Sequence, residues 1–197
     1  MSFFIWGTLP DKELLSVAAD GQLSSLPVLD KQVRRMLADP RADALGERFA
    51  AMWLRLQDID KVKPDPNFYP NFDDNLASMM RTETIMFFNH LVREDRSLMD
   101  LYTANYSFMN ERLARHYGIT GVAGNDFRKV TYPDARRRGI LGQGSMLVQT
   151  SMANRTSPVL RGKWVMEVLL GTPPPPPPPN VPDLEAAGEA KEGRQLT

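Results

Sequence analysis

"DDNLASMMRTETIMFFNHLVR", residues 73–93, carries a long helical signal near the middle of the chain. Its first residue, Asp73, is a good N-cap, because a carboxylate can accept the free backbone N–H groups of the first helical turn. The apolar side chains that follow at helical spacing are Leu76, Met79, Met80, Met86, Phe87 and Leu91. The pattern predicts one long helix that begins after Asp73 and reaches about Arg93.

Four further helical patterns lie in the chain before residue 119. Each combines apolar residues at intervals of three or four with residues that favour a helix end. Gly21 and the Asp39-Pro40 pair end the first two, and Gly118 ends the last, for which Ser107 or Asn110 is the expected N-cap. The first helix is expected between the Pro10-Asp11 pair and Gly21, the second over 26–37, the third from Ala42 to about Leu56, and the last within 106–118.

The helix expected from Ala42 is strongly amphipathic, so its large apolar residues should face the core. These residues are Leu45, Phe49, Met52, Trp53 and Leu56. We therefore predict that Trp53 is a buried core residue, and we predict the same for Trp164 on the apolar face of a later helix.

After Gly118 the glycines multiply and the pattern changes. "FRKVTYP", residues 127–133, has strand character, whereas "SPVLRGKWVMEVLLG", residues 157–171, predicts a helix with both ends marked. Ser157 is its N-cap and Pro158 takes the first helical position, where a missing N–H costs nothing. Gly171 ends the helix, and the seven prolines that follow it favour a stiff polyproline II rod.

Together these patterns predict a mainly α fold: an irregular multi-helix bundle with a small mixed, glycine-rich C-terminal module and a polyproline tail. We expect a helical domain over 1–118, a mixed module over 119–172 that ends in the capped helix, and a proline-rich spacer with a disordered tail over 173–197. The apolar run at 3–6 is too short for a signal peptide or a membrane span. We interpret it as the inside of a helix, so the helical domain is expected to be N-terminally truncated and the chain to be a fragment of a longer protein.

The composition, with 42% hydrophobic and 24% charged residues, is that of a soluble globular protein. The chain has no cysteine, which excludes disulfides, thiolate metal sites and covalent c-type haem attachment within it. The formal net charge is zero, yet residues 128–163 carry eight basic residues and a single acidic one, Asp134. This basic block lacks the aromatic interleaving and zinc spacing of nucleic-acid binders, so we expect it to dock against the acidic remainder of the chain and not against nucleic acid.

Glu83, His90 and His116 are weak candidates for chemistry. Glu83 and His90 lie two turns apart on the long helix, where a carboxylate and an imidazole could bind a metal or shuttle a proton. The Glu-x-x-His and His-Glu-x-x-His spacings of common metal sites are absent, so a salt-bridged Glu83 and a helix-end histidine are the simpler interpretation. "GILGQGS", residues 139–145, lacks the ending of a phosphate loop, and its glycines are expected to permit a turn and close packing. No catalytic residue and no metal ligand is assigned.

The helix start at Ser157 is a candidate anion or domain-docking site. It offers free N–H groups and the positive end of a helix dipole, and Arg155, Arg161 and Lys163 lie close by in the sequence. Such a site would suit a carboxylate from another domain, a haem propionate or a sugar acid. In the competing interpretation Ser157 only caps the helix and the basic side chains are solvated.

Much of the chain resembles the planctomycete-type multidomain cytochrome c proteins, through two adjoining domains of unknown function numbered 1592 and 1588. The most specific motifs are "NERLARHYGI" at 110–119, "RTSPVLRGKW" at 155–164 and "LLGTPPPPPPPNVP" at 169–182. Other similar stretches are "FFIWGTLPDKELL", "QVRRMLADPRADAL", "FAAMWLRL" and "RRGILGQGSMLVQTSMANRTSP". The resemblance implies an exported, periplasmic or secreted protein in which a haem-bearing segment follows the proline run.

The resemblance also implies a role. The chain would be a non-catalytic accessory or docking module that is associated with electron transfer, holds no cofactor itself and has the downstream haem c domain as its partner. Two alternatives remain open: an enzyme domain that acts on polysaccharide or another polymer, and a carbohydrate-binding module, for which exposed tryptophans or tyrosines should form a platform. The substrate, electron partner and oligomeric state do not follow from the sequence.

Overall fold

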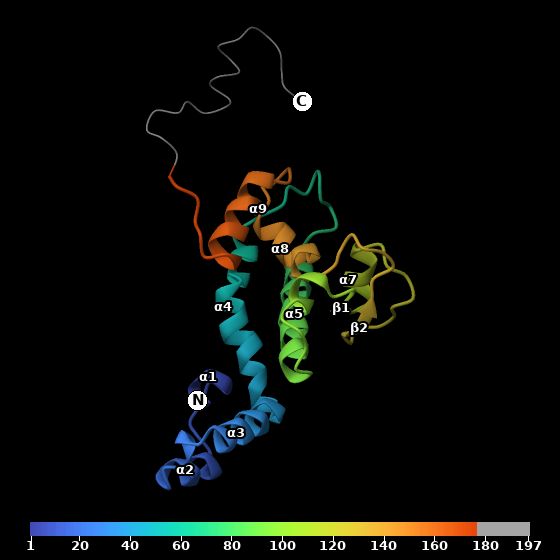
Figure 1. Cartoon of the computed structure of the whole chain (residues 1–197). Coiled ribbons are helices and arrows are strands. Elements are labelled where there is room, and N and C mark those ends of the chain that lie inside the picture. Colours follow the sequence, from blue (N-terminus) through green and yellow to red (C-terminus); the bar gives the residue numbers. More distant parts are fainter. Residues whose placement is uncertain (177–197) are drawn as a thin grey trace. The chain divides into compact units, whose positions relative to one another are not determined.

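The computed structural model describes residues 1–176, and the chain divides into two compact units, Met1–Arg161 and Gly162–Thr197. Most regular structure is helical, with one two-stranded antiparallel sheet, so the predicted mainly α class is confirmed (Figure 1). No helix within residues 1–176 is both long and apolar enough to cross a membrane. The prediction for the tail falls mostly on residues 177–197, outside the described ones.

The α-helices and strands follow one another along the chain as in Figure 1. They are α1 (Ser2–Ile5), α2 (Lys12–Ala19), α3 (Leu26–Ala38), α4 (Ala51–Trp53), α5 (Asp74–Arg93), α6 (Asp100–Thr103), β1 (Tyr106–Met109), α7 (Glu111–His116), β2 (Arg128–Thr131), α8 (Gly144–Gln149) and α9 (Pro158–Trp164). Tighter 3-10 turns cover Gln22–Ser24, Pro40–Asp43, Leu56–Asp60 and Ile140–Gly142, and wider π-helical turns cover Leu45–Ala50 and Val165–Leu169.

Helix α5 is the central element of the first unit and confirms the prediction made from its sequence. The Asp73 carboxylate accepts the N–H of Leu76 at 2.8 Å, as expected of an N-cap. Along its length α5 contacts β1, α7, α8 and the turns on either side of α4. One core combines buried residues of α5 with residues of the turn Leu56–Asp60, of β1 and of α7 and with the residue after β2: Ile59, Leu76, Ala77, Met80, Met109, Leu113, Ala114 and Tyr132.

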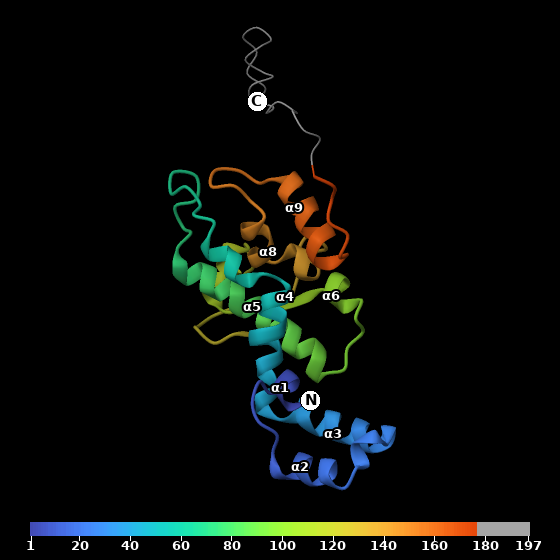
Figure 2. The ribbon, with the colours of Figure 1, turned by 90° about the vertical axis from the view of Figure 1, so that its left-hand side faces the viewer.

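The helices α1, α2 and α3 lie together at one end of the first unit in both ribbon views (Figures 1 and 2). They share a smaller core made of Ile5, Trp6, Leu14, Met36, Ala42 and Leu45. The indole of Trp6 donates to the Met36 carbonyl at 2.9 Å, and the guanidinium of Arg41 lies 3.6 Å from the centre of its ring. A buried, hydrogen-bonded tryptophan therefore fixes this helical group.

The segment 106–109 is a strand and not the start of a helix, so Ser107 is not a helix cap. Asn110 caps α7 instead, because its side-chain oxygen accepts the N–H of Leu113 at 3.0 Å. The four residues before it stay extended and pair with β2, from Tyr106 opposite Thr131 to Met109 opposite Arg128. The strand character predicted for residues 127–133 is confirmed, because β2 lies within them.

The helix expected from Ala42 is broken into π, α and 3-10 turns, with Arg55 in the left-handed region at φ 54°. The wide π-turn shifts the side-chain register, so that Met52 is 73% exposed while Leu54 is buried. Trp53 is only half-buried and stacks on Phe49, which contradicts its predicted core position. The prediction for Trp164 is confirmed, since that side chain is buried.

The predicted start of the later helix is confirmed. Ser157 Oγ accepts the N–H of Leu160 at 3.3 Å, and Pro158 is the first residue of α9. Gly171 follows the helical residues with a positive φ of 63°. The division at residue 118 stays a prediction; the two strands and the α5 core draw on residues from both sides of it.

Candidate functional site

Glu83 of α5 is completely buried and lies at the centre of a polar network. Its carboxylate accepts hydrogen bonds from the hydroxyls of Ser107 at 2.7 Å, Tyr117 at 2.5 Å and Tyr132 at 3.4 Å. These three donors come from β1, from the end of α7 and from the residue after β2. One carboxylate thus connects the central helix, the sheet and α7.

The loop before α8 completes this network. Gln143 Nε2 donates to the Ser107 hydroxyl at 3.3 Å, and the Gly144 N–H donates to the Tyr117 oxygen at 2.7 Å. A Cβ at Gly144 would stand 2.7 Å from the Met80 sulfur. A side chain here would therefore require the buried Met80 side chain to shift, so glycine favours the close packing on helix α5 that the sequence predicted for this glycine-rich stretch.

Burial raises the pKa of Glu83 to about 7, against the opposing effects of the three hydroxyls and of the Arg137 charge. Burial and the neighbouring Glu83 also raise the pKa of Tyr117 and of Tyr132, so both phenols keep their protons and act as donors. The carboxyl group can therefore exchange a proton near neutral pH while its donors stay fixed.

Glu83 forms no salt bridge with any residue of 1–176, which corrects the expected ion pair. The charge of Arg137, whose guanidinium packs 4.1 Å from the centre of the Tyr117 ring, acts on Glu83 without forming a salt bridge. Neutral hydroxyls contact the carboxylate in place of a cation, so the effect of its burial is only partly offset.

The two histidines do not join Glu83. The His90 ring packs edge-on against Tyr106 and Phe108, with Nε2 at 3.1 Å from the Lys129 ammonium. His116 lies at the wall of an apolar cavity. Burial lowers the pKa of both imidazoles, with help from Lys129 at His90 and from Arg137 at His116. Within residues 1–176 no three His, Asp or Glu side chains gather as a metal site would need.

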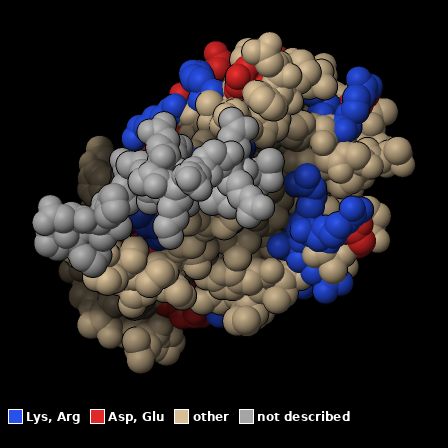
Figure 3. Space-filling model, turned by 90° about the horizontal axis from the view of Figure 1, so that it is seen from above, with Lys and Arg blue, Asp and Glu red and all other residues tan. Residues whose placement is uncertain are grey.

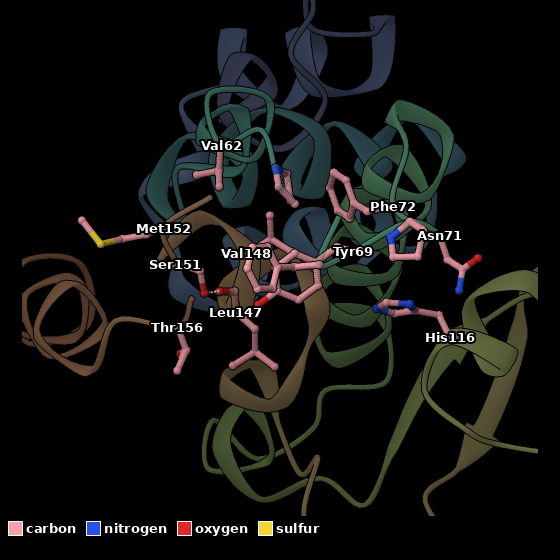
Figure 4. A pocket seen from close by; sticks show the side chains of 13 residues that line it. Val62, Tyr69, Asn71, Phe72, His116, Leu147, Val148, Ser151, Met152 and Thr156 are labelled. Atoms are coloured by element: carbon pink, nitrogen blue, oxygen red, sulfur yellow. Dashed lines mark hydrogen bonds between the residues drawn. The ribbon is translucent and has the colours of Figure 1, made fainter. Parts of the chain in front are cut away.

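The apolar cavity beside His116 has a volume of about 320 Å³ (Figure 4). Its wall is mostly apolar and aromatic, and the hydroxyl of Ser151 in that wall is used in a bond to the Leu147 carbonyl at 2.6 Å. The lining residues are Val62, Pro64, Phe68, Tyr69, Pro70, Asn71, Phe72, His116, Leu147, Val148, Ser151, Met152 and Thr156. The sequence predicted only a proline-broken loop here; the three aromatic residues around Pro70, at 68, 69 and 72, were the available signal.

A second cavity, of about 460 Å³, is lined in part by Tyr117 and Tyr132, the two tyrosines that hold Glu83, and we call it the arginine cavity. Three arginines and one aspartate contribute to a wall that is otherwise aromatic and apolar. It is lined by Tyr117, Gly118, Ile119, Tyr132, Pro133, Asp134, Arg136, Arg137, Leu141, Gly142, Leu147 and Arg161. Among its arginines, only Arg161 belongs to the anion site predicted from the sequence.

The four residues of that predicted site make different contacts. Arg161 donates to the hydroxyls of Thr156 at 3.0 Å and Thr150 at 3.4 Å. Arg155 reaches only the sulfur of Met152, and Ser157 caps α9. Lys163 lies 3.6 Å from the Glu167 carboxylate. The combined site of Arg155, Ser157, Arg161 and Lys163 stays a prediction.

Most cations of the basic segment, residues 128–161, bond to neutral groups. Arg128 donates to the Ala123 carbonyl at 2.7 Å, and Arg137 donates to the Gly142 carbonyl at 3.1 Å. On the face drawn in Figure 3, Lys and Arg side chains form several groups with fewer acidic side chains beside them. Within residues 1–176, Arg136 alone in this segment has a carboxylate partner, Asp134 at 2.6 Å.

Two family models match the chain, and both are described as a protein of unknown function. The first, named PSD4 (DUF1592), matches residues 1–119, and the second, named PSCyt3 (DUF1588), matches residues 137–197. The name of the second model associates these domains with a cytochrome c-like family. No curated protein and no solved structure matches the chain. Because the first model covers more than half of the sequence, the chain belongs to the DUF1592 family of proteins of unknown function.

Proposed function

We propose that this chain is an accessory docking module of an exported, cytochrome c-like multidomain protein, and that it binds an acidic surface of the haem-bearing domain. The observation that carries the proposal is the basic segment, whose cations mostly bond to neutral groups. Cations without an internal counter-charge attract an anionic partner and orient its approach. The family association supplies the class of partner.

The chain's own residues do not fit a c-type haem. Thioether attachment needs cysteine, and the sequence contains none. In this proposal the haem belongs to the partner domain, and this chain provides the surface that positions it. The exported location, periplasmic or secreted, and the link to electron transfer belong to the same proposal.

The carbohydrate alternatives have less support from the described residues. A carbohydrate-binding module would need exposed Trp53, Trp164 or tyrosines as a platform, but Trp53 is half-buried against Phe49 and Trp164 is buried. The carboxylate with the most perturbed pKa, Glu83, is enclosed by hydroxyls and lies outside the wall of the adjoining cavity. Docking therefore accounts for more of the observed chemistry.

The test is a calorimetric titration of this chain with a separately produced haem-bearing segment at low and at high salt. Reversing two exposed cations outside the arginine cavity, in the double variant Arg138→Glu and Arg155→Glu, should weaken binding by about tenfold or more at low salt. Salt should weaken the parent complex as well, because exposed charges are screened beyond roughly 10 Å at 0.1 M.

Arg34→Glu is the matched control, since Arg34 is exposed and already paired with Asp30 at 2.9 Å. This variant should bind the haem-bearing segment like the parent. Equal affinity for the double variant and the parent, or binding that does not respond to salt, would overturn the proposal.

A further inference from the structure

The arginine cavity contains two cations that form no salt bridge with any carboxylate of the described residues. Arg137 and Arg161 are both half-buried in its wall. The third arginine, Arg136, is compensated by Asp134, which lines the same cavity at 2.6 Å from it. The remaining positive charge of the cavity therefore comes from Arg137 and Arg161.

Both cations are held in place by neutral groups. Arg137 stacks on the Tyr117 ring at 4.1 Å and donates to the Gly142 carbonyl at 3.1 Å. Arg161 is held by the hydroxyls of Thr150 and Thr156. Each guanidinium has five N–H donors, and these bonds use only one on Arg137 and two on Arg161. Fixed side chains with unused donors lose little rotamer entropy when a ligand binds.

The other residues that line the arginine cavity determine which kind of chemical group can be attached to a bound anion. Ile119, Pro133, Leu141 and Leu147 are apolar, and the tyrosine side chains contribute aromatic surface. The volume of about 460 Å³ lies in the range of small-molecule sites. A hydrated inorganic ion would leave these apolar walls in contact with water, whereas an apolar group would cover them.

We infer that the arginine cavity binds a carboxylate that is carried on an apolar or aromatic body, with Arg137 and Arg161 as its two cationic partners. A guanidinium matches the two oxygens of a carboxylate with two parallel N–H bonds. The inference rests on the proposed docking function and deepens it, because it names the chemical group that the partner would insert.

The test is a calorimetric titration of the full chain with 1-naphthoate at low salt. The naphthoate should bind, its neutral amide should bind at least about tenfold more weakly, and inorganic phosphate should also bind more weakly than naphthoate. Arg137→Gln and Arg161→Gln should each weaken naphthoate binding by about tenfold. Arg137→Lys and Arg161→Lys keep the charge but lose the planar fork, and should fall between the parent and the glutamine variants.

Arg34→Gln is the control, because this exposed arginine is paired with Asp30 and does not line the cavity. It should bind naphthoate like the parent, and thermal melts of all variants should confirm that they fold. Equal binding of naphthoate and its amide, or equal loss in the Arg34 control, would overturn the inference. Naphthoate binding with no affinity for the haem-bearing segment would instead refute the proposed docking function alone.

Discussion

Residues 1–93, which we call the first half, and the basic segment, which we call the basic half, use their arginines differently. In the first half, Arg35 lies 2.6 Å from Asp11 and Arg93 lies 2.8 Å from Asp43, so these cations join separate elements of the fold. In the basic segment, Arg161 holds its place through threonine hydroxyls. The difference indicates that charge in the first half joins elements of the fold, while most cations of the basic half have no carboxylate partner within residues 1–176.

The largest expected effect concerns Glu83, the buried acid that no cation compensates. An unfolded glutamate loses its proton near pH 4.5, whereas the folded carboxyl keeps it to about pH 7. The unfolded state therefore binds fewer protons between these values, and the free energy of unfolding should fall by about 3 kcal/mol as the pH rises through this window. Urea unfolding at a series of pH values measures this slope.

Glu83→Gln should lose most of this slope between pH 4.5 and 7. Asp39, a paired acid of the first half, titrates below this window because Arg41 lowers its pKa to about 2. A slope of the same size in the glutamine variant would assign the effect to other groups.

The stability of the first half should depend on Asp11. This carboxylate accepts the N–H of Leu14 as the N-cap of α2 and also accepts two hydrogen bonds from Arg35. Asp11→Ala should lower the free energy of unfolding by about 2 kcal/mol, roughly half from the lost cap and half from the lost pair. Asp30→Ala, which breaks an exposed pair with Arg34, is the control and should cost less than about 0.5 kcal/mol. An equal loss of unfolding free energy for the two substitutions would contradict the structural role of the Asp11–Arg35 pair.

The basic half should tolerate loss of its charges. Arg137→Gln and Arg161→Gln remove no ion pair within residues 1–176, because their partners are a carbonyl and two hydroxyls. Each should change the free energy of unfolding by less than about 1 kcal/mol, measured by the same urea titration. A loss as large as that of Asp11→Ala would mean that these arginines stabilise the fold and would weaken the comparison.

The sequence predicted elements whose determinants are local. Helix α5 was predicted from its Asp73 cap and its apolar spacing, and the start of α9 from Ser157 and Pro158. Strand β1 was missed because its partner, β2, lies about twenty residues further along the chain. The helix from Ala42 was predicted as regular because a π-turn leaves no clear mark in the apolar pattern.

The candidate site was predicted only in part, because its contacts join residues that are far apart in the sequence. Glu83 and Arg161 were both named, but their surroundings were not. Tyr117, Tyr132 and Arg137 meet around them only after α7 and both strands have packed on α5. One signal was present: Glu83 lies between two apolar positions of the α5 helical pattern, where a carboxylate has to be buried or displaced.

The most direct test of the account follows the arginine Nε–H resonances of the ¹⁵N-labelled chain during a titration with 1-naphthoate at low salt. Arg137 and Arg161 should shift together with one dissociation constant, since both line the arginine cavity. Arg35 and Arg93, which are paired with carboxylates, should stay in place. Shifts of similar size at all four arginines, or none at Arg137 and Arg161, would contradict the claim that the basic segment keeps its charge for an external anion.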